Sequence, residues 1–141
     1  MADYYLQFSC ELDVGAENAR GALALYQTMA DELEAEEGVG IGFEVEASDG
    51  HPASLWIHDD GGCGEPEQVI AFVLRCAEAF DLKGRWGFCW ALTCSRPRLD
   101  AFGGGAQVFD LGTRKSLDWV DCANWLALQL QADPAEDAPG G

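Results

Sequence analysis

The sequence predicts an α+β protein with a ferredoxin-like (split βαβ) plait, an antiparallel sheet that carries helices on one face. Segments in which apolar and polar residues alternate, typical of half-buried strands, are interleaved with segments whose apolar residues recur every three or four positions, typical of amphipathic helices. The first six segments follow the order strand, helix, strand, strand, helix, strand, which is that of a split βαβ unit. An extra strand and helix follow toward the C-terminus.

The N-terminal half supplies a strand, a helix and a hairpin. Residues 4–14 alternate apolar and polar side chains, which predicts one half-buried strand that ends before Gly15. Residues 16–37 carry a single apolar stripe and predict a helix. Residues 41–47 and 53–59 alternate again on either side of a turn, and therefore predict a β-hairpin.

The C-terminal half continues with a helix over residues 65–80, which has a proline in its first turn and one apolar stripe. Strands are predicted over residues 86–94 and 106–111. The glycines at 103–105 fall in the intervening loop, where they indicate a close backbone approach or a bulge, because phosphate-cradling glycines instead join a strand to a helix. A last helix is predicted over residues 117–131.

The chain has 141 residues, a length that suits one domain. We expect a single α+β domain over residues 1–131 and a disordered acidic tail over residues 132–141, which lack apolar periodicity. No run approaches the roughly 20 apolar residues of a membrane span. The first residues lack the features of a secretory signal, so we expect the cytoplasm of the host cell.

Charge is the strongest compositional feature. The chain has 25 acidic and 8 basic side chains, and its formal net charge is −17. Residues 1–82 hold 18 acids and 2 bases, residues 83–115 hold 2 acids and 6 bases, and residues 116–141 hold 5 acids and no base. Such a chain is repelled by nucleic acid and by anionic membranes. We therefore expect a basic protein surface as its partner, with no direct nucleic-acid or membrane contact.

The acids concentrate on the sheet positions that we expect to face outward and at the end of the first helix. RNA-binding proteins of ferredoxin-like architecture place aromatic and basic residues on this face, whereas here the sign of the charge is reversed. The candidate partner-binding residues are Glu11, Asp13, Asp31, Glu32, Glu34, Glu36, Glu37, Glu44, Glu46 and Trp56. The basic loop with Arg96 and Arg98 is the alternative binding surface.

The six cysteines have no CxxC spacing, so they do not form a recognisable zinc or redox motif. Cys10, Cys76 and Cys122 fall on or beside apolar stripes, where a free thiol behaves as a small hydrophobic group. We expect reduced structural thiols, no cofactor and no metal. The alternative is a small enzyme or metal protein that uses His58 with cysteines, the candidates being Cys63, Cys89 and Cys94.

The last helix is apolar around most of its circumference. Such a helix is either packed between other elements or exposed for association. We expect it to be buried against its own domain, with a homodimer contact as the alternative.

The stretch from Trp86 to Arg98 reads WGFCWALTCSRPR, and Phe102 opens FGGGA. These segments resemble the shared core of a group of small phage and mobile-element proteins, Trp-Ala-x-Thr-Cys-Ser-x-Pro-Arg followed by Phe-Gly-Gly-Gly-Ala. The resemblance extends through the Trp119 region to Trp125 and covers residues 86–125. It implies a mobile-element setting, in which small acidic proteins commonly inhibit host defence.

Charge and resemblance together predict a non-enzymatic, anti-CRISPR-like inhibitor. Its acidic face would occupy the nucleic-acid groove of a host defence complex, with carboxylates in place of phosphates and Trp56 as an apolar contact. The same physics allows an immunity protein that blocks a basic nuclease toxin. The contrasting class is the metal protein or enzyme built on His58 and the cysteines.

Overall fold

The computed structural model describes residues 3–38, 40–48, 50–62, 64–99 and 101–132. The predicted tail therefore lies outside the described residues except for Ala132, and so does Cys63. The elements in chain order are β1 (Tyr4–Gln7), β2 (Ser9–Asp13), the short 3₁₀ helix η1 (Ala16–Asn18), α1 (Ala19–Glu37), β3 (Phe43–Ser48), β4 (His51–Asp59), α2 (Pro66–Phe80), β5 (Arg85–Cys94), β6 (Gly103–Asp110), β7 (Lys115–Asp121) and α3 (Cys122–Gln131).

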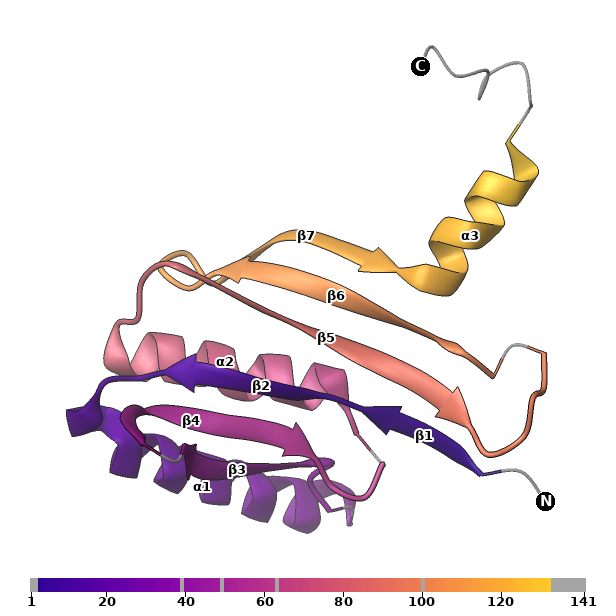
Figure 1. Ribbon diagram of the computed structural model, residues 1–141. Helices are drawn as coiled ribbons and strands as arrows, with labels where there is room; N and C mark the ends of the chain where they lie inside the picture. Colours follow the sequence, from indigo (N-terminus) through magenta and orange to yellow (C-terminus); the bar gives the residue numbers. More distant parts are fainter. Residues whose placement is uncertain (1–2, 39, 49, 63, 100, 133–141) are drawn as a thin grey trace.

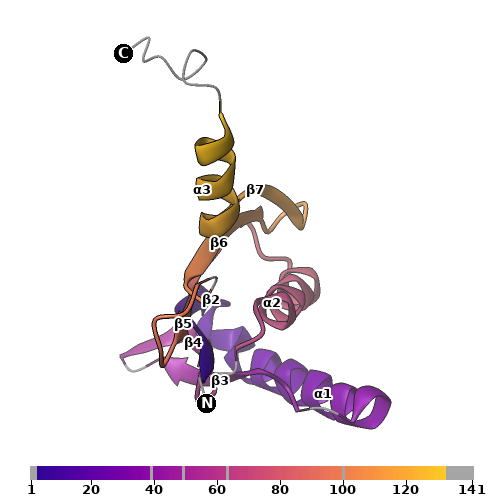
Figure 2. The ribbon, with the colours of Figure 1, turned by 90° about the vertical axis from the view of Figure 1, so that its right-hand side faces the viewer.

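The α+β class is confirmed, but the strands form two antiparallel sheets and not the one sheet that the sequence predicts. The first sheet has the strand order β1-β5-β6-β7 and the second has the order β2-β4-β3. They meet where β1 and β2, consecutive in the chain, cross the middle of the molecule (Figure 1). Helices α1 and α2 lie on the same side of the strands (Figure 2).

Phe8 divides the predicted strand over residues 4–14 into β1 and β2. Its backbone N–H donates to the side-chain Oδ1 of Asp59 at 2.9 Å, and its carbonyl accepts from the Asp59 N–H at 3.1 Å. Strand β4 ends at Asp59, so β1 pairs with β5 alone. On the N-terminal side of Phe8, the backbone N–H of Leu6 donates to the carbonyl of Gly62, and the carbonyl of Leu6 accepts from the N–H of Gly64. The predicted alternation nevertheless holds across the break, because the Phe8 side chain is buried.

The core lies between the two helices and the inner faces of the sheets. Helix α2 buries Val69, Phe72, Val73 and Cys76 as its spacing predicts, and β3 and β4 contribute residues such as Phe43. The aromatic rings of Tyr26, Phe43 and Phe72 meet at centroid separations of 5.3 to 6.0 Å. The Tyr26 hydroxyl donates to the Phe43 carbonyl, which fixes α1 against β3.

The glycine run at 103–105 lies within β6, where the sequence predicts a loop. Gly104 has φ +141°, and a Cβ there would lie 2.3 Å from the carbonyl oxygen of Trp90. A Cβ at Gly105 would lie 2.6 Å from the Trp90 ring. The expected close backbone approach is therefore confirmed, because β5 and β6 pack too tightly here for any side chain.

The predicted helix over residues 117–131 is wrong in its first part. Residues Lys115–Asp121 form β7, which pairs with β6, and only Cys122–Gln131 form α3. Asp121 begins the helix, since its side chain accepts a hydrogen bond from the Asn124 N–H at 2.8 Å. The expected burial of this helix is also wrong, because every residue of α3 is exposed. Helix α3 stands away from the rest of the molecule (Figure 2).

Within the described residues, none of the helices combines the length and the apolar character that crossing a membrane requires.

Candidate functional site

The candidate site is the outer face of the β2-β4-β3 sheet. Strand pairing places Glu11, Trp56 and Glu46 in one row across the three strands, and Ser9, His58 and Glu44 in the next row. Residues directly opposite one another in antiparallel strands project to the same face. The alternate positions on the same strands, which include Leu12, Val45, Leu55 and Ile57, are buried in the core. The two rows therefore lie on the face away from α1 and α2.

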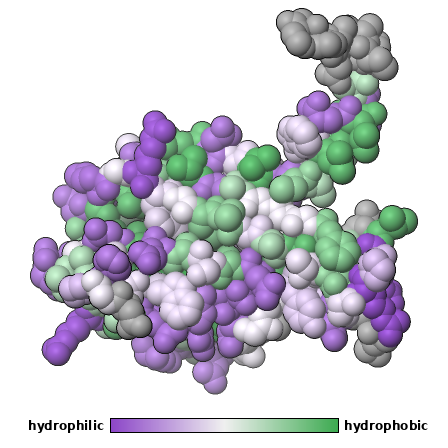
Figure 3. All heavy atoms as spheres, in the orientation of Figure 1, coloured by the Kyte–Doolittle hydropathy of each residue, from purple (hydrophilic) through white to green (hydrophobic). Residues whose placement is uncertain are grey.

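Five of the predicted partner-binding residues come together here, and we call them the acidic sheet face: Glu11, Asp13, Glu44, Glu46 and Trp56. All five side chains are exposed. Hydrophilic residues gather over β2, β3 and β4 in the lower left of Figure 3. The alternation in each strand was enough to predict these positions, because neighbouring side chains in a strand point to opposite faces.

The predicted acids of the first helix do not belong to this surface. Asp31, Glu34, Glu36 and Glu37 are exposed on α1, on the opposite side of the sheet (Figure 2). Glu32 is engaged within the fold, because its Oε2 lies 2.8 Å from Nη2 of Arg75 on α2. The candidate partner-binding residues therefore lie on two separate surfaces. This separation depends on how the strands pair and on which side of the sheet α1 crosses between β2 and β3. The local pattern of apolar and polar residues in the sequence shows neither of these.

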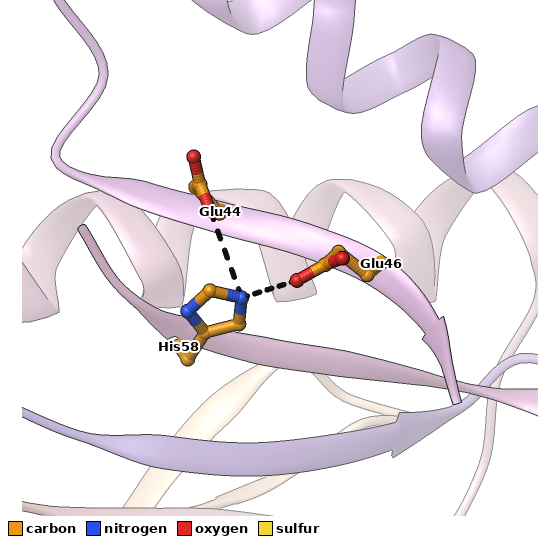
Figure 4. A group of neighbouring side chains, drawn as sticks. All are labelled: Glu44, Glu46 and His58. Carbon is orange, nitrogen blue, oxygen red and sulfur yellow. Dashed lines mark hydrogen bonds and ion pairs between the residues drawn. The ribbon is translucent and has the colours of Figure 1, made fainter. Parts of the chain in front are cut away.

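His58 lies between the carboxylates of the acidic sheet face (Figure 4). Its Nε2 is 2.7 Å from Oε2 of Glu46 and 3.8 Å from Oε2 of Glu44, while its Nδ1 is 2.9 Å from the carbonyl oxygen of Asp59. The carbonyl can only accept a hydrogen bond, so Nδ1 carries a proton. A second proton on Nε2 then donates to Glu46. The geometry therefore favours the positively charged imidazolium.

The pKa of His58 is raised above its ordinary value. Burial by itself would lower this pKa, and the His58 side chain is only 17% exposed. The hydrogen bond to Glu46, the bond to the Asp59 carbonyl, and the charges of Glu46 and Glu44 together outweigh that effect and raise the pKa. The His58 imidazolium thus offsets part of the repulsion between Glu44 and Glu46.

Trp56 forms an apolar platform between the acids. Its ring is tilted by 30° over the His58 ring, with 4.0 Å between centroids, and its Nε1–H donates to Oγ of Ser9 at 2.7 Å. The Trp56 side chain remains 40% exposed. Beside it is a hollow of about 350 Å³ whose lining includes Trp56, Glu11 and Glu46. A partner side chain can therefore meet both a carboxylate and an aromatic face at one point.

Glu44, Glu46 and His58 are also the group among the described residues that can hold a metal ion, because one ligand atom from each lies within 4.8 Å of the others. The alternative that combines His58 with cysteines finds no support in the described residues, where no cysteine belongs to such a group. Cys63 lies outside them. Sequence reasoning singled out His58 and both glutamates but missed their contact. The signal was present in the hairpin, whose pairing sets His58 opposite Glu44.

The thiols divide into two classes. Burial raises the pKa of Cys76 to about 12. The pKa of Cys10 is also raised to about 12, mainly by burial and to a smaller extent by the charge of Cys89. These two thiols stay protonated near neutral pH, as expected for structural cysteines. Cys122 differs from the expectation, because it is exposed at the start of α3.

Comparison of the chain with protein-family models, with curated proteins and with solved structures finds no match. The functional interpretation therefore depends on the side chains described above. Their arrangement provides fixed negative charge around an exposed aromatic ring on a sheet, which suits binding to a basic surface. The loop residues Arg96 and Arg98 are exposed as well, but they belong to the turn after β5 and lie outside the acidic sheet face.

Proposed function

We propose that the protein is a non-enzymatic inhibitor of phage or mobile-element type, anti-CRISPR-like, that blocks a basic nucleic-acid-binding surface of a host defence complex. The acidic sheet face makes the contact in the host cytoplasm. One observation carries the proposal: exposed carboxylates from β2 and β3 flank an exposed Trp56 on the sheet face that α1 and α2 leave open.

The arrangement suits replacement of a nucleic-acid strand. Residues two apart in a strand are about 6.6 Å apart, and neighbouring strands are about 4.8 Å apart. Glu44 and Glu46, and likewise Glu11 and Asp13, therefore present charge at regular intervals, as successive phosphates do. Because the sheet fixes their backbones, little backbone conformational entropy is lost when a partner binds them. Trp56 supplies the stacking surface that a base would otherwise provide.

Net charge and the sequence resemblance support the setting. A charge of −17 on 141 residues exceeds the magnitude of about 2–8 that solubility requires in a small domain. It accelerates association with a basic surface and makes that association sensitive to salt. Residues 86–125 resemble the core of phage and mobile-element proteins. The alternative function, an immunity protein that blocks a basic nuclease toxin, would use the same face. Identification of the target distinguishes the immunity protein from the inhibitor of host defence.

The ferredoxin-like interpretation of the fold belongs to the same proposal. The order β2, α1, β3, β4, α2, β5, with both helices on one side, supports a split βαβ plait whose first strand is divided at Phe8. In this interpretation β6, β7 and α3 are additions. The acidic sheet face then corresponds to the open face that RNA-binding proteins of this architecture use.

The deciding experiment reverses charge on one face at a time. Glu11→Lys with Glu44→Lys changes the acidic sheet face, while Glu34→Lys with Glu36→Lys makes the same change in net charge on α1. Lysines near the end of α1 favour the negative end of the helix dipole, so the control retains its fold. Each variant competes with target DNA for a panel of purified CRISPR effector complexes at fixed salt.

We expect the sheet variant to lose at least 100-fold in inhibition and the helix variant to change by less than threefold. The loss is large because each lysine both removes an attraction and opposes the basic groove. If the sheet variant and the helix variant lost inhibition equally, inhibition would depend on the net charge of the protein and not on the acidic sheet face. Full inhibition by the sheet variant would refute the proposed surface.

A second candidate function is binding of a divalent cation by Glu44, Glu46 and His58. The observation that favours it is the geometry of the three ligand atoms, together with the Asp59 carbonyl that orients His58 through Nδ1 and leaves Nε2 facing both carboxylates. Calorimetric titration with Zn²⁺ and with Mn²⁺ tests it. Stoichiometric binding that Glu44→Gln abolishes supports a metal centre, whereas the absence of heat with either ion excludes it.

A further inference from the structure

The hollow beside Trp56 lies within the acidic sheet face, and its chemistry selects the group that can enter it. It has a volume of about 350 Å³, and its described lining consists of Glu11, Glu46, Ala47, Ser48 and Trp56. Glu11, Trp56 and Glu46 stand in one row across β2, β4 and β3. The indole ring therefore lies on the central strand, with one carboxylate on each side of it.

Trp56 stands between this hollow and His58. On β3, Glu44 lies opposite His58, whereas the hollow reaches Ser48 at the other end of the strand. The His58 ring covers Trp56 from the first side, with 4.0 Å between the ring centroids. The Trp56 side chain is nevertheless 40% exposed. The part of the indole ring that borders the hollow is therefore open to a partner.

Both carboxylates of the hollow have an oxygen to offer. Glu46 accepts from His58 through Oε2, with 2.7 Å between the two atoms, so its other oxygen, Oε1, is available to a partner. Glu11 and Glu46 are both exposed. A group that enters the hollow thus meets negative charge on two sides and an aromatic ring between them.

A guanidinium group fits this arrangement better than an ammonium group does. Guanidinium is planar and carries its five N–H donors in its own plane, so it can stack on an aromatic ring and still donate to carboxylates beside that ring. The ammonium group of lysine is a compact, strongly hydrated charge and gains less from the ring. Free arginine also carries a carboxylate, which the acidic sheet face repels, whereas an arginine residue inside a protein chain has none.

We propose that the hollow binds the side chain of an arginine of the partner protein, which stacks its guanidinium on Trp56 and donates to Glu11 on one side and to Glu46 on the other. The inference rests on the proposed function for the identity of the partner, a protein with a basic nucleic-acid-binding surface. Because arginine is a principal phosphate-binding residue, occupation of the hollow withdraws it from nucleic acid. Trp56 then determines the preference for arginine over lysine.

The test compares two fluorescently labelled peptides of equal charge, tetra-arginine and tetra-lysine, both with blocked ends. Fluorescence anisotropy at one low salt concentration measures their affinities. We expect the wild-type protein to bind tetra-arginine about fivefold more tightly, the size of effect that an aromatic ring gives with an exposed cation. Trp56→Ala should bind the two peptides equally, because the remaining acids attract both by charge alone. Trp56→Phe keeps an aromatic ring and should retain the preference.

Trp119→Ala is the matched control, because Trp119 is an exposed tryptophan of β7, outside the acidic sheet face. It should keep the wild-type preference for tetra-arginine. NMR spectra place the contact: the indole N–H signal that disappears in Trp56→Ala should shift when tetra-arginine is added to the wild-type protein. Equal affinities of the wild-type protein for the two peptides would overturn the inference, and so would a preference that survives Trp56→Ala or an indole signal that does not move.

The peptide experiment and the inhibition experiment can fail separately, because the peptides require no defence complex. A protein that inhibits an effector complex but shows no preference for arginine would overturn the arginine site alone. A protein that prefers arginine through Trp56 but inhibits no complex of the panel would overturn the proposed target and leave the arginine site in place.

Discussion

Glu46 on β3 accepts a hydrogen bond from His58 on β4, with 2.7 Å between Oε2 and Nε2, on the open face of the sheet. The pairing joins the two strands of a hairpin through a charge that depends on pH. It also places one cation among the carboxylates that we propose as the binding surface. Both stability and binding should therefore respond to the protonation of His58.

The first prediction concerns stability against pH. The pKa of His58 is raised in the folded protein, so its contribution is fully present below the ordinary histidine pKa of about 6.5 and is lost as pH rises through the folded value. We expect the difference in unfolding free energy between wild type and His58→Gln to shrink as pH rises above about 6.5. Urea denaturation at a series of pH values measures it. A difference that grows with pH would contradict the assignment of the imidazolium.

The second prediction concerns thiol reactivity. Burial raises the pKa of Cys10 and Cys76 to about 12, whereas Cys89 and Cys122 are exposed. Because the thiolate is the reacting species, iodoacetamide at neutral pH should label Cys89 and Cys122 first, and Cys10 and Cys76 only after denaturation. Mass spectrometry locates the labels. A separate, unlabelled sample denatured without reductant should yield six free thiols, and recovery of fewer would reveal disulfides.

The third prediction concerns the tight contact between β5 and β6. Gly104→Ala introduces a Cβ that would lie 2.3 Å from the Trp90 carbonyl oxygen, at a φ of +141° that L-residues rarely adopt. We expect a loss of about 3 kcal/mol in unfolding free energy, since backbone strain and a steric clash add. Gly40→Ala is the control, because nothing lies within 4 Å of its added Cβ. Equal stability of the two variants would show that the strands separate easily.

The alternation of apolar and polar residues predicted which side chains of a strand point inward, because this orientation depends only on the strand itself. Alternation identified Phe8 and Leu12 as inward and Glu11 as outward, and the structure agrees. The division of the first strand was not predictable, because it depends on the Asp59 carboxylate, 51 residues from Phe8. The separation of Glu44 from the α1 acids was hidden for the same reason, since it follows from the crossover between elements.

The C-terminal region shows a different limitation. Trp119 in β7 and Ala123, Leu126 and Leu130 in α3 fit one helical periodicity when they are taken as a single segment. The signal that separates them is Asp121, which caps α3 by accepting from Asn124. Burial was misjudged because an apolar helix in one chain does not reveal whether its partner is that chain or another molecule.

The last prediction separates the apolar and the electrostatic parts of the proposed contact. Trp56 is exposed beside Glu11 and Glu46, so Trp56→Ala removes an aromatic surface and leaves the net charge unchanged. Buried aromatic residues at the centre of an interface typically contribute about 2 kcal/mol or more, and we therefore expect inhibition to weaken about 30-fold.

Salt distinguishes this effect from charge reversal. The loss caused by Trp56→Ala should be nearly the same at low and high ionic strength, because apolar contacts are not screened. The loss caused by Glu11→Lys with Glu44→Lys should shrink as salt rises. Competition with target DNA at several salt concentrations measures both. If the two losses followed salt in parallel, Trp56 would act only by holding His58 and the carboxylates in place, and the aromatic contact with the partner would have to be abandoned.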